Sequence, residues 1–201
     1  MPIPSRTLGF SAAITACTLL LPGCRTFSGQ PGGDLSIQGL NTHTSLLPNI
    51  RTAAYKRLDD NTADLYFSDL PEDRLLDTGD RLTGVSGSII HIHYFLTPSA
   101  GNTPIDETAC NITIRHILLA SGEGGQASGI YGGGGFLFPS GTPGDSLFGG
   151  TIRAATHRLL QSSPNFNDAL GVAALNGKVL APEDETLADA IGGKMRMLMK
   201  P

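Results

Sequence analysis

The fold class is decided by residues 88–96, which read Ser88-Ile89-Ile90-His91-Ile92-His93-Tyr94-Phe95-Leu96. One set of alternate positions is purely apolar and holds Ile90, Ile92, Tyr94 and Leu96. The other set mixes apolar and imidazole side chains. Because successive side chains of a strand point to opposite faces, this alternation predicts a strand with one face in a core and the other partly exposed.

Similar strand patterns occur on both sides of this stretch. Toward the C-terminus they cover residues 110–119, 130–138, 147–160 and 172–180. Toward the N-terminus, residues 50–57 and 63–70 flank the turn sequence Asp59-Asp60-Asn61 and predict a hairpin. The connectors are rich in Gly, Pro and Ser, and no helical pattern separates the strands. The chain therefore predicts a mainly β fold, an antiparallel β-sandwich-like single domain.

A C-terminal α-helix is predicted from Pro182 to about Met199. Proline suits a first helical turn, and the acidic run Glu183-Asp184-Glu185 lies where the helix dipole favours negative charge. An apolar stripe follows at helical spacing, at Leu187, Ile191, Met195 and Leu198. We expect this helix to close one edge or end of the sheet. Residues 71–86 are polar, and there we expect irregular chain with one short helical turn.

The first residues have the pattern of an export signal. Arg6 is the only charged side chain before an uncharged apolar run from Leu8 to Leu21. That run is shorter than the roughly 20 apolar residues that span a bilayer, and it fits the apolar middle of a secretory signal peptide.

The segment ends in Leu21-Pro22-Gly23-Cys24, which resembles the lipobox of bacterial lipoproteins. The resemblance implies that signal peptidase II removes residues 1–23 and that Cys24 carries fatty acyl chains such as palmitate. In that family an Asp after the cysteine favours the inner membrane, whereas this chain has Arg25. The resemblance therefore implies a lipid anchor in the cell membrane or outer membrane, on the periplasmic side. The outer membrane is favoured if the cell has two membranes.

The lipobox divides the chain into three predicted parts. Residues 1–23 are the signal peptide. Residues 24–45 are the lipidated cysteine and a flexible tether, because they include Ser28-Gly29-Gln30-Pro31-Gly32-Gly33 and few large apolar side chains. Residues 46–201 are the β-rich globular domain. The resemblance covers the first 24 residues only, and no family is recognised for residues 25–201.

The charge and the cysteines of the chain argue against a nucleic-acid partner and against an internal disulfide. The chain has 14 basic and 18 acidic residues, so it carries no basic footprint for nucleic acid. Cys17 leaves with the signal and Cys24 is lipidated, which leaves Cys110 without a partner for an internal disulfide. We expect Cys110 to be a small buried hydrophobic residue.

The pair His91 and His93 is the strongest candidate for chemistry. On a strand these imidazoles share one face and lie about 6.6 Å apart along the chain, a spacing that suits joint binding of Zn²⁺, Cu²⁺ or Fe²⁺. His116 and His157 lie in other predicted strands and are candidates for the remaining ligands. The tripeptide resembles the His-x-His of cupins and of copper–zinc superoxide dismutases. The glutamate that cupins place shortly afterwards is absent from residues 95–98.

Two other motifs are interpreted structurally. Leu75-Leu76-Asp77-Thr78-Gly79 resembles the aspartic protease signature, but a second Asp-Thr-Gly or Asp-Ser-Gly is absent, and we interpret it as a turn. The glycine run at residues 132–135 is followed by a strand pattern rather than a helix, so we interpret it as a bulge or as backbone packed closely against another strand.

Two function classes stay open at this point. The first is a non-catalytic envelope module that binds or scaffolds a protein, glycan or lipid partner, without a cofactor. It follows from the anchor and from the lack of a recognisable catalytic set. The alternative is a metal-binding protein or metalloenzyme built on His91 and His93. We favour the first class.

Overall fold

The structure is a computed structural model that describes residues 31–79, 81–97 and 110–200. The predicted signal peptide and Cys24 lie outside the described residues. In the described part of the chain, no helix is both long and apolar enough to cross a membrane.

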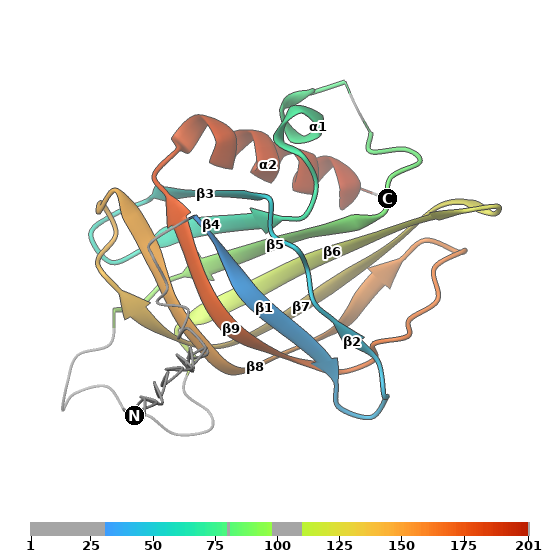
Figure 1. The fold of residues 1–201 in the computed structure, drawn as a ribbon, viewed down its shortest axis with the longest axis horizontal. Helices are drawn as coiled ribbons and strands as arrows, with labels where there is room; N and C mark the ends of the chain where they lie inside the picture. The colour runs from blue at the N-terminus through green and yellow to red at the C-terminus, as the bar shows by residue number, and fades with distance from the viewer. Residues whose placement is uncertain (1–30, 80, 98–109, 201) are drawn as a thin grey trace, which may run out of the picture.

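The described chain forms one antiparallel sheet of nine strands, in the spatial order β2-β1-β9-β8-β7-β6-β5-β4-β3 (Figure 1). From β3 to β9 each strand pairs with the next one along the chain, and β1 adds to the far side of β9. The strands predicted from residue 50 onward correspond to β3 through β9. The strands are β1 Gly32–Gly39, β2 Ser45–Leu46, β3 Thr52–Arg57, β4 Ala63–Ser68, β5 Gly87–Tyr94, β6 Ile112–Gly122, β7 Gly125–Ser140, β8 Leu147–Ser162 and β9 Ala173–Pro182.

The sheet curls until β3 meets the end of β9. Tyr55 of β3 forms a parallel bridge with Glu183, one residue past β9. Pairing of β7 with β8 shifts register between Gly134 and Phe136. Such bulges bend a strand and increase its twist, which helps the sheet to wrap around its own inner face. The predicted β-sandwich-like fold with a C-terminal helix is therefore confirmed.

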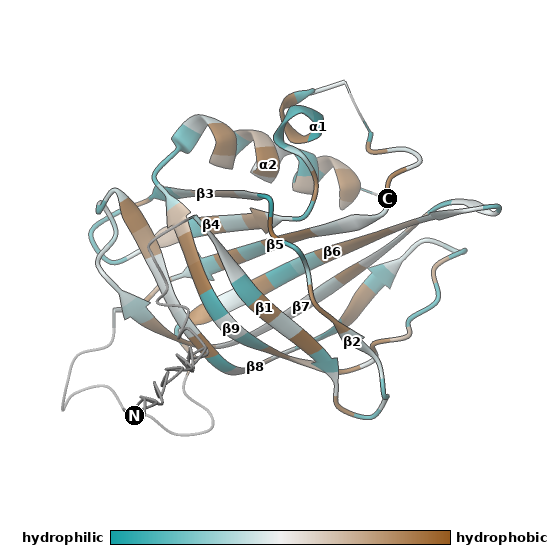
Figure 2. Cartoon of the chain, in the orientation of Figure 1, coloured by the Kyte–Doolittle hydropathy of each residue, from teal (hydrophilic) through white to brown (hydrophobic). Residues whose placement is uncertain are grey.

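The inner face of the curled sheet holds the main hydrophobic core. Ile90, Ile92 and Tyr94 of β5 are fully buried there, as the alternation in residues 88–96 predicts. Hydropathy alternates in the same way along β1, where brown and teal bands follow one another (Figure 2). The core is continuous with the side chains of the neighbouring strands, including Leu65, Phe67, Tyr131, Phe148 and Leu175.

The outer face of the sheet is covered over β3 and β4 by helix α2 (Glu185–Leu198), with the short helix α1 (Glu72–Leu76) beside it (Figure 1). Asp184 caps α2 by accepting a hydrogen bond from the Leu187 backbone N–H at 2.9 Å. Ile191 and Met195 pack in a second core against sheet residues such as Ile89. The predicted helix is confirmed, and it begins at residue 185 because Pro182 still belongs to β9.

The predicted tether over residues 24–45 is wrong from residue 32 onward. Residues 32–39 form β1, which pairs along its whole length with β9. Leu35 and Ile37 are buried in the inner core. Glycines obscure this strand in the sequence, but Gly33 is required there, since a Cβ would overlap the Lys178 carbonyl oxygen.

Cys110 is exposed rather than buried, which corrects the expectation for this residue. Its thiol donates to the Ile112 carbonyl oxygen at 2.9 Å and lies over the bare backbone of Gly134 on β7. The residue precedes β6, so the alternation of that strand does not extend to it.

Candidate functional site

The four candidate histidines lie in two pairs on opposite faces of the sheet. In the β5–β6 register His91 is opposite Arg115, whereas His116 is opposite Ile90 of the inner core. His116 contacts His157 within that inner core. A single site that uses all four imidazoles therefore does not form. Within residues 31–79, 81–97 and 110–200, no group of three or more His, Cys, Asp or Glu side chains is arranged to hold a metal ion.

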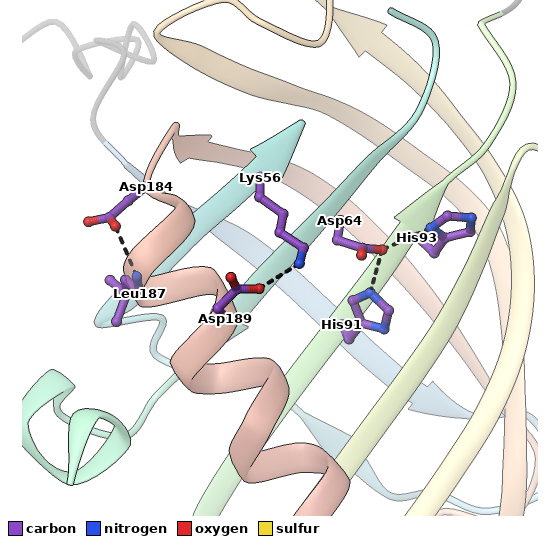
Figure 3. Close-up of polar contacts among 7 residues, drawn as sticks. All are labelled: Lys56, Asp64, His91, His93, Asp184, Leu187 and Asp189. Carbon is purple, nitrogen blue, oxygen red and sulfur yellow. Dashed lines mark hydrogen bonds and ion pairs between the residues drawn. The ribbon is translucent and has the colours of Figure 1, made fainter. Parts of the chain in front are cut away.

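The outer pair is joined by a carboxylate that the sequence did not single out. Asp64 of β4 lies directly opposite His93 in the register. One of its oxygens, Oδ1, is 2.9 Å from His91 Nε2 and 2.8 Å from His93 Nδ1 (Figure 3). Tyr66 stacks on the His91 ring with centroids 4.7 Å apart. The strand pairing brings these groups together, and no local sequence motif could have revealed it.

The Asp64 carboxylate has a structural role, because it is ionised and hydrogen-bonded to both imidazoles. Burial acts to raise the pKa of the Asp64 carboxyl, but hydrogen bonds from His91 and His93 outweigh it and hold that pKa below its usual value. The carboxylate is thus ionised at neutral pH and engages one nitrogen of each imidazole. This arrangement ties β4 to β5 through charge-assisted hydrogen bonds.

The inner face contains a second polar cluster, made of His116, Tyr131, His157 and Asp168. The His116 Nδ1 and His157 Nε2 atoms are 3.5 Å apart. The Tyr131 ring packs against both imidazoles, with centroid distances of 5.7 and 5.5 Å. The Tyr131 hydroxyl donates to Asp168 Oδ1 at 2.6 Å, and the same oxygen accepts from the Gly171 backbone N–H at 2.9 Å.

Burial keeps both inner imidazoles neutral. Loss of solvent lowers the pKa of His116 to about 3, and it lowers the pKa of His157 to about 4. Burial and the neighbouring Asp168 raise the pKa of the Tyr131 hydroxyl, so the phenol stays protonated.

The contact between the imidazoles leaves hydrogen-bonding capacity unused. A neutral imidazole has one N–H and one bare nitrogen. Whichever ring donates, His116 Nε2 and His157 Nδ1 comprise one donor and one acceptor, and neither has a partner in the described part of the chain. An unsatisfied buried group of this kind costs about 1–3 kcal/mol.

A cavity of about 310 Å³ opens beside this inner cluster. Its walls come from β2, β6, β7 and the segment 165–170. Leu118, Phe166 and Leu170 supply apolar surface, and Tyr131 links the cavity to the imidazoles behind it. Two smaller cavities of about 270 Å³ lie beside α2.

The sequence could not have located this cavity, because its walls come from segments far apart in the chain. His116 and His157 were recognised as candidates, but Tyr131, Phe166 and Asp168 carry no motif. Comparison of the chain with protein-family models, with curated proteins and with solved structures finds no match in any of the three.

Proposed function

We propose that this protein is a lipid-anchored, non-catalytic binding module of the cell envelope that holds a small apolar molecule in the cavity beside Tyr131. The observation that carries the proposal is the cavity itself, a largely apolar recess on the inner face of the curled sheet. Asn165, Asn167 and Ala169 of its wall are exposed, so the cavity reaches the protein surface.

The size of the cavity supports a small-molecule ligand. Its volume of about 310 Å³ is within the range of about 300–1,000 Å³ that is usual for ligand sites. A dry apolar cavity of about 150 Å³ accommodates benzene. The recess therefore suits a molecule of two or three rings, or a short acyl chain.

The chemistry around the cavity favours binding over catalysis. The Tyr131 hydroxyl is engaged by Asp168, and the imidazoles behind it are neutral and do not line the cavity. General acid–base catalysis needs a titrating group within reach of the substrate, with a pKa near the working pH. Among the described residues that line this recess, no His, Asp, Glu, Lys or Cys is present.

The cellular setting of the proposal comes from the N-terminal sequence. The lipobox-like segment predicts acylation of Cys24, which precedes the first residue of β1 by eight positions in the sequence. A domain held close to a bilayer is well placed to take up an apolar molecule from it. Any protein or glycan partner would add to this role.

The proposal is tested with N-phenyl-1-naphthylamine, an uncharged apolar fluorophore. The chain lacks tryptophan, so Val172→Trp in the full chain introduces a single donor at an exposed position near Leu170. We expect saturable energy transfer from this tryptophan to the bound probe. A second donor, Leu58→Trp in the turn between β3 and β4, reports background transfer from probe in detergent micelles.

A matched pair of variants locates the binding. In the Val172→Trp background, Ala127→Leu adds bulk inside the cavity, whereas Ala174→Leu adds the same bulk on the outer face of β9. We expect the first variant to weaken binding about tenfold or more and the second to leave it unchanged. Equal affinity in both variants, or no saturable transfer, would refute the proposal.

A further inference from the structure

The wall of the cavity beside Tyr131 is uncharged. Twelve residues line it, and all of those described are uncharged. They include apolar side chains such as Leu118 and Leu170, and polar but uncharged ones such as Asn165 and Asn167. A charged ligand would therefore meet no opposite charge on the cavity wall.

The ionisable groups behind the wall add no positive charge to the cavity. The two imidazoles stay neutral because burial lowers the pKa of His116 to about 3 and that of His157 to about 4. Asp168 is bonded to the Tyr131 hydroxyl and brings negative rather than positive charge. An anion seated against Tyr131 would lose its hydration without gaining a cation, which is strongly unfavourable.

Two aromatic side chains, Tyr131 and Phe166, form part of the wall of the recess. The Tyr131 and Phe166 rings meet edge to face, with centroids 6.3 Å apart and planes 73° apart. The Phe166 ring lies over Gly129, where any larger side chain would overlap it. This pair therefore presents ring surface to a ligand, and aromatic rings pair favourably in such geometries.

We propose that the cavity selects uncharged, ring-containing apolar molecules and rejects anions of the same shape. The selectivity rests on the proposed function, since it presupposes that the cavity is a binding site. It arises from the uncharged wall and from the Asp168 carboxylate immediately behind Tyr131.

The test compares two probes with the same ring skeleton. N-phenyl-1-naphthylamine is uncharged, and 8-anilino-1-naphthalenesulfonate adds one anionic group. In the full chain with Val172→Trp, we expect the sulfonate to bind about tenfold or more weakly than the uncharged probe. If both probes bind equally, the selectivity is refuted while the binding function stands. If neither gives saturable transfer, the binding function itself fails.

A charge variant tests the role of Asp168. Asp168→Asn keeps an acceptor for the Tyr131 hydroxyl and removes the negative charge. We therefore expect the ratio of the affinities for the two probes to shrink severalfold. Asp73→Asn removes the same charge from α1, away from the cavity, and serves as the control. A difference that is unchanged in Asp168→Asn, or reduced equally in Asp73→Asn, would overturn the assignment to Asp168.

Discussion

Among single residues, the inner imidazoles His116 and His157 are both buried, and burial lowers the pKa of each. Both side chains are at most 2 % exposed, and for His157 burial outweighs the nearby Asp168 carboxylate, which favours the protonated ring. The folded protein therefore holds them neutral at a pH where the unfolded chain protonates them. This difference makes stability depend on pH.

The sign of that dependence follows from the two states. In the unfolded chain both histidines titrate near 6.5, and in the folded protein their pKa values fall to about 3 and about 4. Below pH 6.5 the unfolded state binds more protons, so stability is full above that pH and declines toward pH 4. Each histidine contributes a slope of up to about 1.4 kcal/mol per pH unit.

We expect His116→Phe/His157→Phe to flatten this decline. The free energy of unfolding, measured in urea between pH 7 and pH 4.5, should fall steeply in the parent and much less in the variant. The exposed His43 provides a control, since His43→Gln should keep the parental slope. Parallel slopes in the parent and in His116→Phe/His157→Phe would show that the imidazoles are not the source.

The outer imidazoles, His91 and His93, lead to a prediction about metal binding. Because the described residues contain no group of three or more His, Cys, Asp or Glu side chains arranged to hold a metal ion, we expect added zinc to leave the thermal midpoint unchanged. A zinc-dependent rise that disappears in His91→Ala/His93→Ala would instead support the alternative metal-binding function. Differential scanning fluorimetry without chelators measures the thermal midpoint with and without zinc.

At the scale of elements, α2 depends on a capping contact at its start. Asp184 accepts from the Leu187 backbone N–H, which would otherwise lack a partner in the helix. We expect Asp184→Ala to lower the free energy of unfolding by about 1 kcal/mol. Thr186→Ala, at an exposed position in the same turn, should have little effect. Equal losses in both variants would contradict the assignment of the effect to the cap, since helix propensity alone favours alanine at both positions.

The elements also show how far a sequence pattern reaches. Alternation predicted β5 and its buried face, and the turn at residues 59–61 predicted the hairpin of β3 and β4, because both signals are local. β1 was not predicted, because its sequence is rich in glycine and contains only two large apolar side chains, Leu35 and Ile37. The contact of Asp64 with His91 and His93 depends on strand register, and the cavity depends on how the sheet curls. Neither is encoded in a local pattern.

For the whole molecule, the proposed function combines a predicted N-terminal lipid anchor with a domain that contains a cavity. The anchor is a prediction from the lipobox-like segment. We expect Cys24→Ala to prevent acylation and to remove the mass of the acyl chains from the purified protein. The protein should then leave the membrane fraction or accumulate with its signal uncleaved. Unchanged mass and unchanged membrane partition of the mature chain would contradict the anchor.

The proposed ligand site is the cavity beside Tyr131. Hydrogen–deuterium exchange of the full chain, with and without N-phenyl-1-naphthylamine, tests it most directly. Binding there should slow exchange in peptides that cover residues 118–131 and 163–171, since these segments form the wall and neighbour it. Slower exchange confined to α2, or no change in those two segments at saturating probe, would contradict the account.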